Sequence, residues 1–121
     1  MRDSRDVETL LYEELTKDGH SASAHVVPPA ISSPHIHVVR TGGYERDMVI
    51  EVNLVDFDVY ADDAATAMET ASALCGWVRD LDCCYASDIT TLPYHNPDPR
   101  HPNIARVTFK AQILTRIVER N

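Results

Sequence analysis

The fold is decided by the stretch from Pro34 to Val78, which reads PHIHVVRTGGYERDMVIEVNLVDFDVYADDAATAMETASALCGWV. This stretch predicts a strand over 35–40, a turn at 41–43, a longer strand over about 48–60, and then a helix. Two strands joined by a short turn most simply pair as an antiparallel hairpin. A helix that directly follows the long strand is expected to pack back against the sheet.

Apolar and polar residues alternate along the long strand, but the phase of the alternation changes halfway. The apolar residues are Ile50, Val52 and Leu54 before the change, and Val55, Phe57 and Val59 after it. Side chains of a strand point alternately to its two faces. The change therefore predicts an inserted residue, a β-bulge, near Leu54 and Val55, and a long, bent central strand.

Two amphipathic helices are predicted. The first runs from about Ser4 or Asp6 to Lys17, and Gly19 ends it. The second begins at an N-cap, Asp62 or Asp63. Its apolar stripe at helical spacing is rich in alanine and consists of Ala64, Ala67, Met68, Ala71, Leu74, Cys75 and Val78.

Trp77 lies outside the main apolar stripe of this second helix. Tryptophan is common both at the edge of a core and in interfaces between chains. Trp77 could therefore lie either at the edge of the core or in an interface between chains.

The remaining elements are shorter. Val26 and Val27 form a possible short strand, 83–91 a third strand, and the alternating residues from Ile104 onward a last strand. Between the last two strands, 93–103 holds four of the seven prolines. Proline removes a backbone donor, so this segment is predicted to be irregular. It is expected to be a stiff, extended hairpin loop that contacts a neighbouring subunit, or else a surface loop that contacts nothing.

The fold class that these elements predict is α+β. We expect one domain over 1–121, with a mixed, mainly antiparallel sheet and two helices packed on it.

The charge of the chain disfavours a general nucleic-acid binder. Its 121 residues carry a formal net charge of -8, whereas binding to phosphate groups needs a basic surface. Neither an apolar run of roughly 20 residues nor an apolar signal segment is apparent, so a protein made and kept in a cytoplasm is expected. The three cysteines, Cys75, Cys83 and Cys84, lack the spacing of a zinc site and are interpreted as small buried apolar residues.

Two pairs of polar residues are candidates for metal or acid–base chemistry. His35 and His37 point the same way on a strand and could share a metal with His25 or an aspartate. The simpler interpretation is two histidines on the wet face of an edge strand. Asp56 and Asp58 also share a face and could bind a hard cation, but ordinary solvated polarity explains them as well.

No catalytic motif is found in the sequence. A nucleophile elbow, a glycine-rich phosphate loop and a metalloprotease histidine pair are all missing. Gly42 and Gly43 precede a strand and not a helix, which favours a hairpin turn over a phosphate site. We therefore predict that the protein is not an enzyme and has no catalytic, cofactor-binding or metal site.

The order of these elements resembles that of the tail terminator proteins of long-tailed bacteriophages, especially those of actinobacterial hosts. The similarity covers most of the chain. It consists of the first helix, Pro34 to His37 with Val38, Arg40, Thr41, Gly42 and Gly43, Asp47 before the long strand, the alanine-rich helix, the proline-rich stretch ending near Arg100 and His101, and a last strand ending at Arg116.

This resemblance implies a virion structural protein that forms a six-membered ring at the head-proximal end of the tail tube. Such a ring stops tube polymerisation and provides the surface for joining the head. The implied partners are the tail tube protein on one face of the ring and a head-completion protein on the other. DNA would pass through the lumen without specific binding, for which an acidic lining is suited.

Two segments are predicted to contact a partner or a neighbouring subunit, and each could instead be a simple structural turn. The residues are Arg40, Gly42, Gly43 and Tyr44 at a hairpin tip, and Pro97, Asp98 and Arg100 in the proline-rich segment. Two other functions remain open. A head-closure or adaptor protein would bind the portal instead of the tube, and a small metal-dependent enzyme would bind a metal stoichiometrically.

Overall fold

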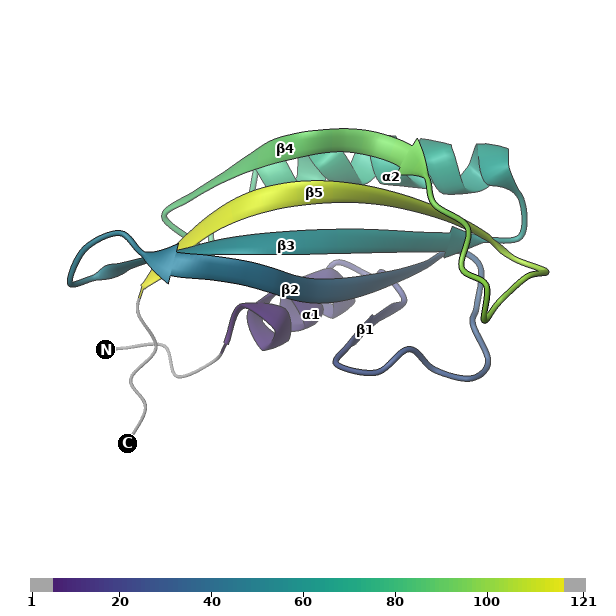
Figure 1. Ribbon diagram of the computed structural model, residues 1–121, viewed down its shortest axis with the longest axis horizontal. Coiled ribbons are helices and arrows are strands. Elements are labelled where there is room, and N and C mark those ends of the chain that lie inside the picture. Colours follow the sequence, from purple (N-terminus) through teal and green to yellow (C-terminus); the bar gives the residue numbers. More distant parts are fainter. Residues whose placement is uncertain (1–5, 117–121) are drawn as a thin grey trace.

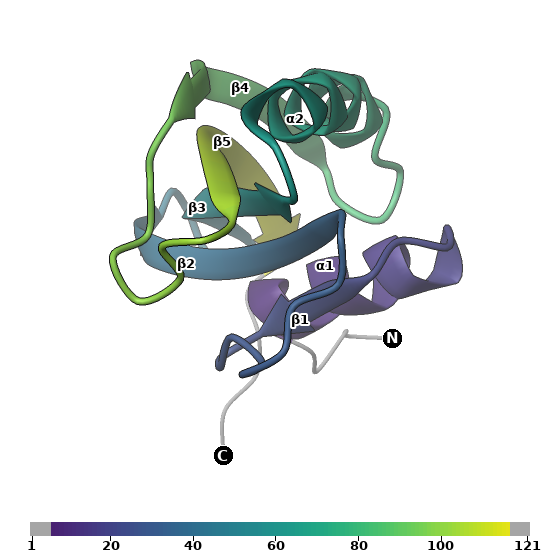
Figure 2. The same ribbon diagram turned by 90° about the vertical axis from the view of Figure 1, so that its right-hand side faces the viewer.

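A computed structural model describes residues 6–116 and has two layers (Figure 1). One layer is a five-stranded sheet in the order β1-β2-β3-β5-β4, in which only β1 and β2 are parallel. The other layer consists of α1 (Val7–Lys17) and α2 (Ala64–Arg79), which cover one face of the sheet (Figure 2). The strands are β1 Ala22–Ala24, β2 His35–Glu45, β3 Ile50–Ala61, β4 Ala86–His95 and β5 Ala105–Arg116. The predicted α+β class, with a mainly antiparallel sheet and two helices on it, is confirmed.

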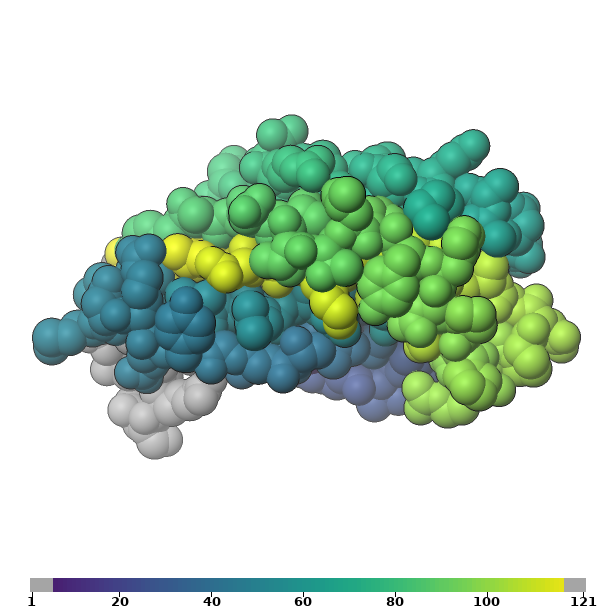
Figure 3. Space-filling view, turned by 45° about the horizontal axis from the view of Figure 1, so that its top comes forward, coloured from purple at the N-terminus to yellow at the C-terminus, as the bar shows by residue number. Residues whose placement is uncertain are grey.

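The molecule has two distinct ends. The turn between β2 and β3 projects at one end, and the loop 96–104 between β4 and β5 projects at the other (Figure 3). We call the sheet face without helices the open face. In the described part of the chain, no helix is long and apolar enough to cross a membrane.

Both helices begin and end where their capping residues predict. The carboxylate of Asp6 accepts a hydrogen bond from the Thr9 amide at 2.8 Å, and that of Asp63 accepts one from the Thr66 amide at 2.7 Å. After α1, Gly19 takes a φ of 88°, a left-handed conformation that glycine adopts at low cost. The two predicted helices are therefore confirmed.

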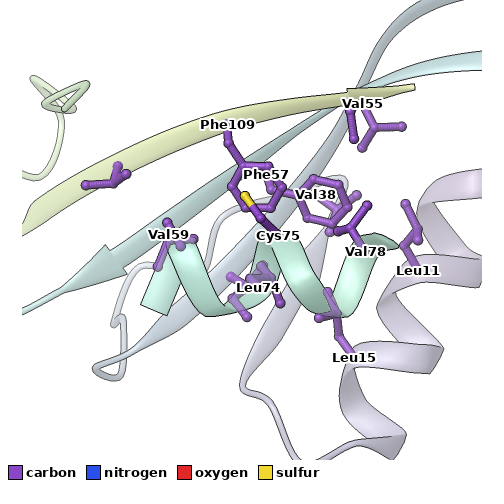
Figure 4. Close-up of a cluster of buried hydrophobic side chains, with 14 of the residues drawn as sticks. Leu11, Leu15, Val38, Val55, Phe57, Val59, Leu74, Cys75, Val78 and Phe109 are labelled. Carbon is purple, nitrogen blue, oxygen red and sulfur yellow. The ribbon is translucent and has the colours of Figure 1, made fainter. Parts of the chain in front are cut away.

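The core lies between the helices and the sheet. Phe57 of β3 and Phe109 of β5 are cross-strand partners whose rings stack 4.9 Å apart. Apolar side chains of both helices point at these rings (Figure 4). Ala67 and Ala71 are completely buried, because small side chains let α2 approach the sheet closely. Each fully buried Phe, Leu or Val contributes about 1.5–3 kcal/mol to folding.

The predicted hairpin exists, but its turn is not at the glycines. β2 continues through Gly42 and Gly43 to Glu45, and the chain reverses at 46–49. There, the Asp47 carboxylate accepts hydrogen bonds from the amides of Val49 and Ile50, at 2.8 and 2.9 Å. The turn is therefore stabilised by an aspartate, as is common in turns. Gly42 and Gly43 belong to strand β2.

The predicted bulge also lies on the other strand. β3 pairs with β5 without interruption, whereas the β2 register shifts where Arg40 pairs with Val55 and Gly42 with Leu54. Thr41 is thus the extra residue, and the prediction of a bulge within β3 was wrong. The hydrophobic phase changes because the buried face changes. Val55 and its successors face the helices, while Ile50 and Val52 are buried on the open face.

Two other strand predictions were wrong in position. The short strand is β1, and Val26 and Val27 follow it in an irregular segment. The strand predicted over 83–91 begins at Ala86 instead and continues through Pro93 to His95. Pro93 is tolerated because β4 is an edge strand, and the register shifts around it. The alternation predicted for the last strand is confirmed in β5.

Candidate functional site

The middle of the open face carries paired charges. Asp56 and Asp58 of β3 share this face, as predicted, but each has a partner on β5. Lys110 donates to both oxygens of Asp56 at 2.9 and 3.0 Å, and Thr108 donates to Asp58 at 2.7 Å. The Asp56 carboxylate raises the pKa of Lys110. The two aspartates are therefore committed to cross-strand contacts.

Asp98 is the centre of the polar end of this face. Its side chain accepts hydrogen bonds from the Tyr60 hydroxyl at 3.0 Å, the Arg100 amide at 3.0 Å and His101 Nδ1 at 3.1 Å. The Arg106 guanidinium lies 3.6 Å away. Burial by itself would raise the pKa of Asp98, but these donors and the Arg106 charge hold it well below its usual range. Asp98 is a buried anion with a complete set of partners.

The loop 96–104 is consequently folded against the sheet. Arg106 Nε donates to the Asn96 carbonyl at 2.6 Å, and the Asn96 amide group donates to Thr108 at 3.1 Å. The prediction that 93–103 is wholly irregular was wrong, because its first three residues belong to β4. Asp98 was also predicted from an exposed position, but it is only 3% exposed. Pro97 and Arg100 are exposed, and their contact with a partner stays a prediction.

Arg40, Gly42 and Gly43 lie within β2 and not at a hairpin tip. Arg40 Nε donates to the Asn53 side chain at 2.8 Å, and the Arg40 amide donates to Glu8 at 3.0 Å. A Cβ on Gly43 would overlap the Val52 carbonyl oxygen and come within 2.6 Å of the Arg40 guanidinium. Glycine is thus required at 43 by the close approach of the Val52 backbone carbonyl. A contact of these residues with another subunit stays a prediction.

Exposed apolar side chains gather at the hairpin end of the sheet. We call this group the apolar end; its members are Tyr44, Met48, Val49, Leu54 and Tyr85. Met48 is 94% exposed and Tyr44 58%. The members come from separate elements, which the sheet places at the same end of the molecule. Tyr44 pairs with Val52, Val52 with Leu114, and the Leu114 carbonyl accepts from the Tyr85 amide at 2.9 Å.

Of the apolar end, only Tyr44 was predicted as a candidate. Met48 and Val49 follow the charged pair Arg46 and Asp47 and precede the buried part of the strand. The prediction placed this pair at the start of the strand over about 48–60, so its exposure in a turn was missed. No local signal could have found Tyr85, because only the sheet register places it at the same end of the sheet as Tyr44.

His35 and His37 lie on the open face of the sheet, beside Tyr60 and Asp58, and are buried there at 4% and 5% exposure. They share a face, as predicted, but β2 is not an edge strand, because β1 adds to it. Three of their four ring nitrogens contact serine hydroxyls. Ser23 Oγ lies 2.8 Å from His35 Nε2 and 2.7 Å from His37 Nδ1, and Ser21 Oγ lies 2.8 Å from His35 Nδ1. A metal bound to both rings would have to displace these hydroxyls.

His25, the predicted third ligand, lies in another cluster. Its Nδ1 is 3.2 Å from Glu8, and potential ligand atoms of Asp6, Glu8 and His25 lie within 4.8 Å of one another. In the described residues, this is the single group of three such side chains. Asp6 and Glu8 also cap α1 and contact Arg40, respectively, so these carboxylates already have structural partners.

Trp77 lies at the edge of the core, which is one of its two predicted positions. Its indole Nε1 donates to Asp18 at 2.6 Å, and its ring meets His20 edge-on at 6.2 Å between centroids. Trp77 therefore connects α2 to the segment that follows α1.

Comparison with known proteins does not assign a family. No protein-family model matches the chain, and no curated protein is similar to it in sequence.

Proposed function

We propose that the protein is a tail terminator, a virion structural protein that caps the head-proximal end of a phage tail tube as a ring. In this role it stops tube polymerisation and provides the surface for head–tail joining. The observation that carries the proposal is the apolar end, where Tyr44, Met48, Val49, Leu54 and Tyr85 are exposed together. The resemblance in the order of the elements, described above, also supports this function.

An exposed apolar group of this kind supports assembly. Monomers rarely expose large contiguous apolar patches, and such patches mark contact sites. The turn 46–49 between β2 and β3, which contains Met48 and Val49, projects beyond the rest of the sheet (Figure 1). Burying such a side chain fully contributes about 1.5–3 kcal/mol. The hairpin end is therefore suited to insertion into a neighbouring surface.

The asymmetry of the molecule supports a ring. The two ends of the molecule differ, because at the end opposite the apolar end Asp98 and its partners form a polar network. A contact between unlike surfaces is head-to-tail, and it closes into a ring when the rotation between subunits divides a full turn. In such a ring, Pro97 and Arg100 are exposed on the loop at the far end and are available to the neighbour or to the tube.

Light scattering of the purified protein tests the proposal. We expect a ring with six times the 13.5 kDa mass of one chain, alone or after addition of tail tubes. The double variant Met48→Asp, Val49→Asp should stay monomeric with an unchanged melting temperature, because both side chains are exposed in the single chain. Leu92→Asp, an exposed apolar residue on β4 away from the hairpin, is the matched control and should still assemble.

The partner decides between connector roles. Binding to tail tubes, seen by negative-stain microscopy as a cap at one end, is the expected result. Binding to a portal ring instead would assign a head-closure role. A monomer that binds neither, or a double variant that assembles like the parent protein, would refute the proposal.

A further inference from the structure

A continuous chain of hydrogen bonds runs through the two buried histidines of β2. It starts at Ser32, whose Oγ is 2.8 Å from Ser21 Oγ, and passes from Ser21 to His35 Nδ1 at 2.8 Å. From His35 Nε2 it continues to Ser23 at 2.8 Å and then to His37 Nδ1 at 2.7 Å. We call the group Ser21, His35, Ser23 and His37 the histidine clasp.

The chemistry of these groups gives the chain a direction. A neutral imidazole has one donor and one acceptor nitrogen, and a serine hydroxyl has a single proton. Ser23 must therefore donate to one ring and accept from the other. All contacts are satisfied when Ser21 donates to His35, His35 Nε2–H donates to Ser23, and Ser23 donates to His37 Nδ1.

This direction places the remaining proton of His37 on Nε2. Asp58 is the cross-strand partner of His37 and shares its face of the sheet. Its negative charge favours a proton on the ring of His37. The opposite direction would leave a lone pair at Nε2 and is therefore less favourable beside this carboxylate.

The histidine clasp holds a weak element in place. β1 has only three residues, pairs with β2 alone, and covers the outer edge of β2 (Figure 2). The Ile36 amide donates to the Ser21 carbonyl at 2.9 Å. The large apolar cluster is built from the two helices and from β2, β3 and β5, with Ala22 as the contribution of β1. Loss of β1 would thus leave most of the core intact.

We propose that the histidine clasp is a pH-sensitive latch, which holds the segment 20–34 over the edge of β2 while its rings are neutral and releases it when mild acid protonates them. The released state exposes the backbone amides of β2 at the sheet edge, where another strand could pair. The latch lies within one chain and is independent of the proposed ring.

Protonation of both rings is incompatible with the chain of hydrogen bonds. One added proton is accommodated, because Ser21 can turn its own proton toward Ser32. When both rings are protonated, His35 Nε2 and His37 Nδ1 are both donors, so Ser23 meets two donors and its own proton has no acceptor. With both rings charged, two cations also lie on either side of one buried hydroxyl.

Charged groups from several elements face the clasp. Asp58 on β3 and Glu8 on α1 favour protonation of His37, while Arg100 of the loop 96–104 opposes it. A charge on His37 opposes protonation of His35. The cross-strand partner of His35 is Tyr60. Burial raises the pKa of the Tyr60 hydroxyl, so Tyr60 stays neutral. Burial is the largest influence, and it lowers the pKa of both histidines.

The lowered pKa values determine the sign of the effect. The unfolded or released histidine has a pKa of about 6.5 and binds protons more readily than the clasped one. The clasp is therefore fully stabilising above about pH 6.5. Its stabilisation is lost as the pH falls from there through the lower values of the clasped rings.

Amide hydrogen exchange, corrected for the intrinsic effect of pH, tests the release. Between pH 7.5 and pH 5.0, we expect the opening equilibrium of the Ile36 amide to rise at least roughly tenfold, the factor for one unit of pKa difference. Amides of α2 and β5 should not change, since the core does not depend on β1. A rise of the same size in α2 and β5 would indicate global unfolding and overturn the proposal.

Nitrogen NMR of the rings provides a second readout that needs no variant. At pH 7.5 both histidines should be neutral with the proton on Nε2, and at pH 5.0 their protonation should parallel the exchange of Ile36. Rings that stay neutral at pH 5.0 while Ile36 exchange rises would overturn the proposal. So would protonation without any change in Ile36.

Two variants separate the clasp from other histidines. His37→Asn places an amide group near the position of Nδ1, and this group cannot be protonated. The rise in the opening equilibrium of the Ile36 amide between pH 7.5 and pH 5.0 should therefore be at least threefold smaller. His95→Gln removes an exposed histidine of β4 and should keep the full effect. Equal behaviour of the two variants would contradict the latch, and the measurements on the unaltered protein decide the question if His37→Asn does not fold.

Discussion

At one end of the open face, the buried Asp98 carboxylate accepts hydrogen bonds from Tyr60, Arg100 and His101. At the other end, Met48 and Tyr44 are exposed to solvent. The first end is complete within a single chain, because each strong donor meets an acceptor. The second end gains free energy when something covers it. The comparison indicates that the Asp98 end stabilises the fold and that the apolar end is available for assembly.

Removing the Asp98 carboxylate should give the largest effect. Asp98→Ala leaves the Tyr60 hydroxyl without its acceptor and the largely buried Arg106 without its anionic partner. Breaking a buried charged contact costs about 3–5 kcal/mol, so we expect a loss near 3 kcal/mol in the free energy of unfolding. Denaturant titration measures it. Arg100→Ala is the control: its side chain is 78% exposed, and it should lose at most about 1 kcal/mol.

The two glycines of β2 provide a matched pair. Gly43→Ala should destabilise the protein by about 1–3 kcal/mol, because its Cβ would overlap the Val52 carbonyl. Gly42→Ala should change little, because nothing lies within 4 Å of the added carbon. Thermal unfolding of both variants checks this difference. Equal losses would show that the Val52 carbonyl does not approach Gly43 as closely as described.

Stronger acid should weaken the polar end. The pKa of Asp98 is lowered in the folded state, so its stabilisation is present above the unfolded value of about 3.9. It is lost as the pH falls below that value. Unfolding free energies measured between pH 6 and pH 3 should fall less steeply in Asp98→Asn than in the parent protein. If the two curves run parallel, Asp98 does not contribute to the loss of stability in acid.

The apolar end should give the smallest effect on the single chain. Met48→Asp should change the unfolding free energy of the monomer by less than about 0.5 kcal/mol, since an exposed side chain loses no burial. The same substitution should impair assembly. Loss of monomer stability by more than 1 kcal/mol would place Met48 in a structural contact and weaken the contrast between the two ends.

Much of the fold was predictable because its signals are local. Caps such as Asp63, the periodic stripe of α2 and the alternation of β5 depend on neighbours a few residues away. The bulge was predicted on the wrong strand for the same reason. A change of phase in one strand shows that the buried face changes, but only the pairing with Thr41 and its neighbours shows where the extra residue lies.

The sites were less predictable. His37 was interpreted as a residue on a wet edge, because nothing in the sequence announces that the segment around Ser23 adds a parallel strand beside it. Asp98 in a proline-rich loop has the composition of an exposed turn, and its burial depends on Tyr60 and Arg106 from two distant strands.

The sequence by itself determined the class of fold, the two helices and the main hairpin, because periodicity, caps and turn residues act over short distances along the chain. Only the tertiary structure decided which polar groups are buried and which apolar groups are left exposed. Burial and hydrogen bonding are properties of strands that lie side by side in space. Asp98 became a buried anion and Met48 an exposed apolar tip through strand pairing that no local pattern specifies.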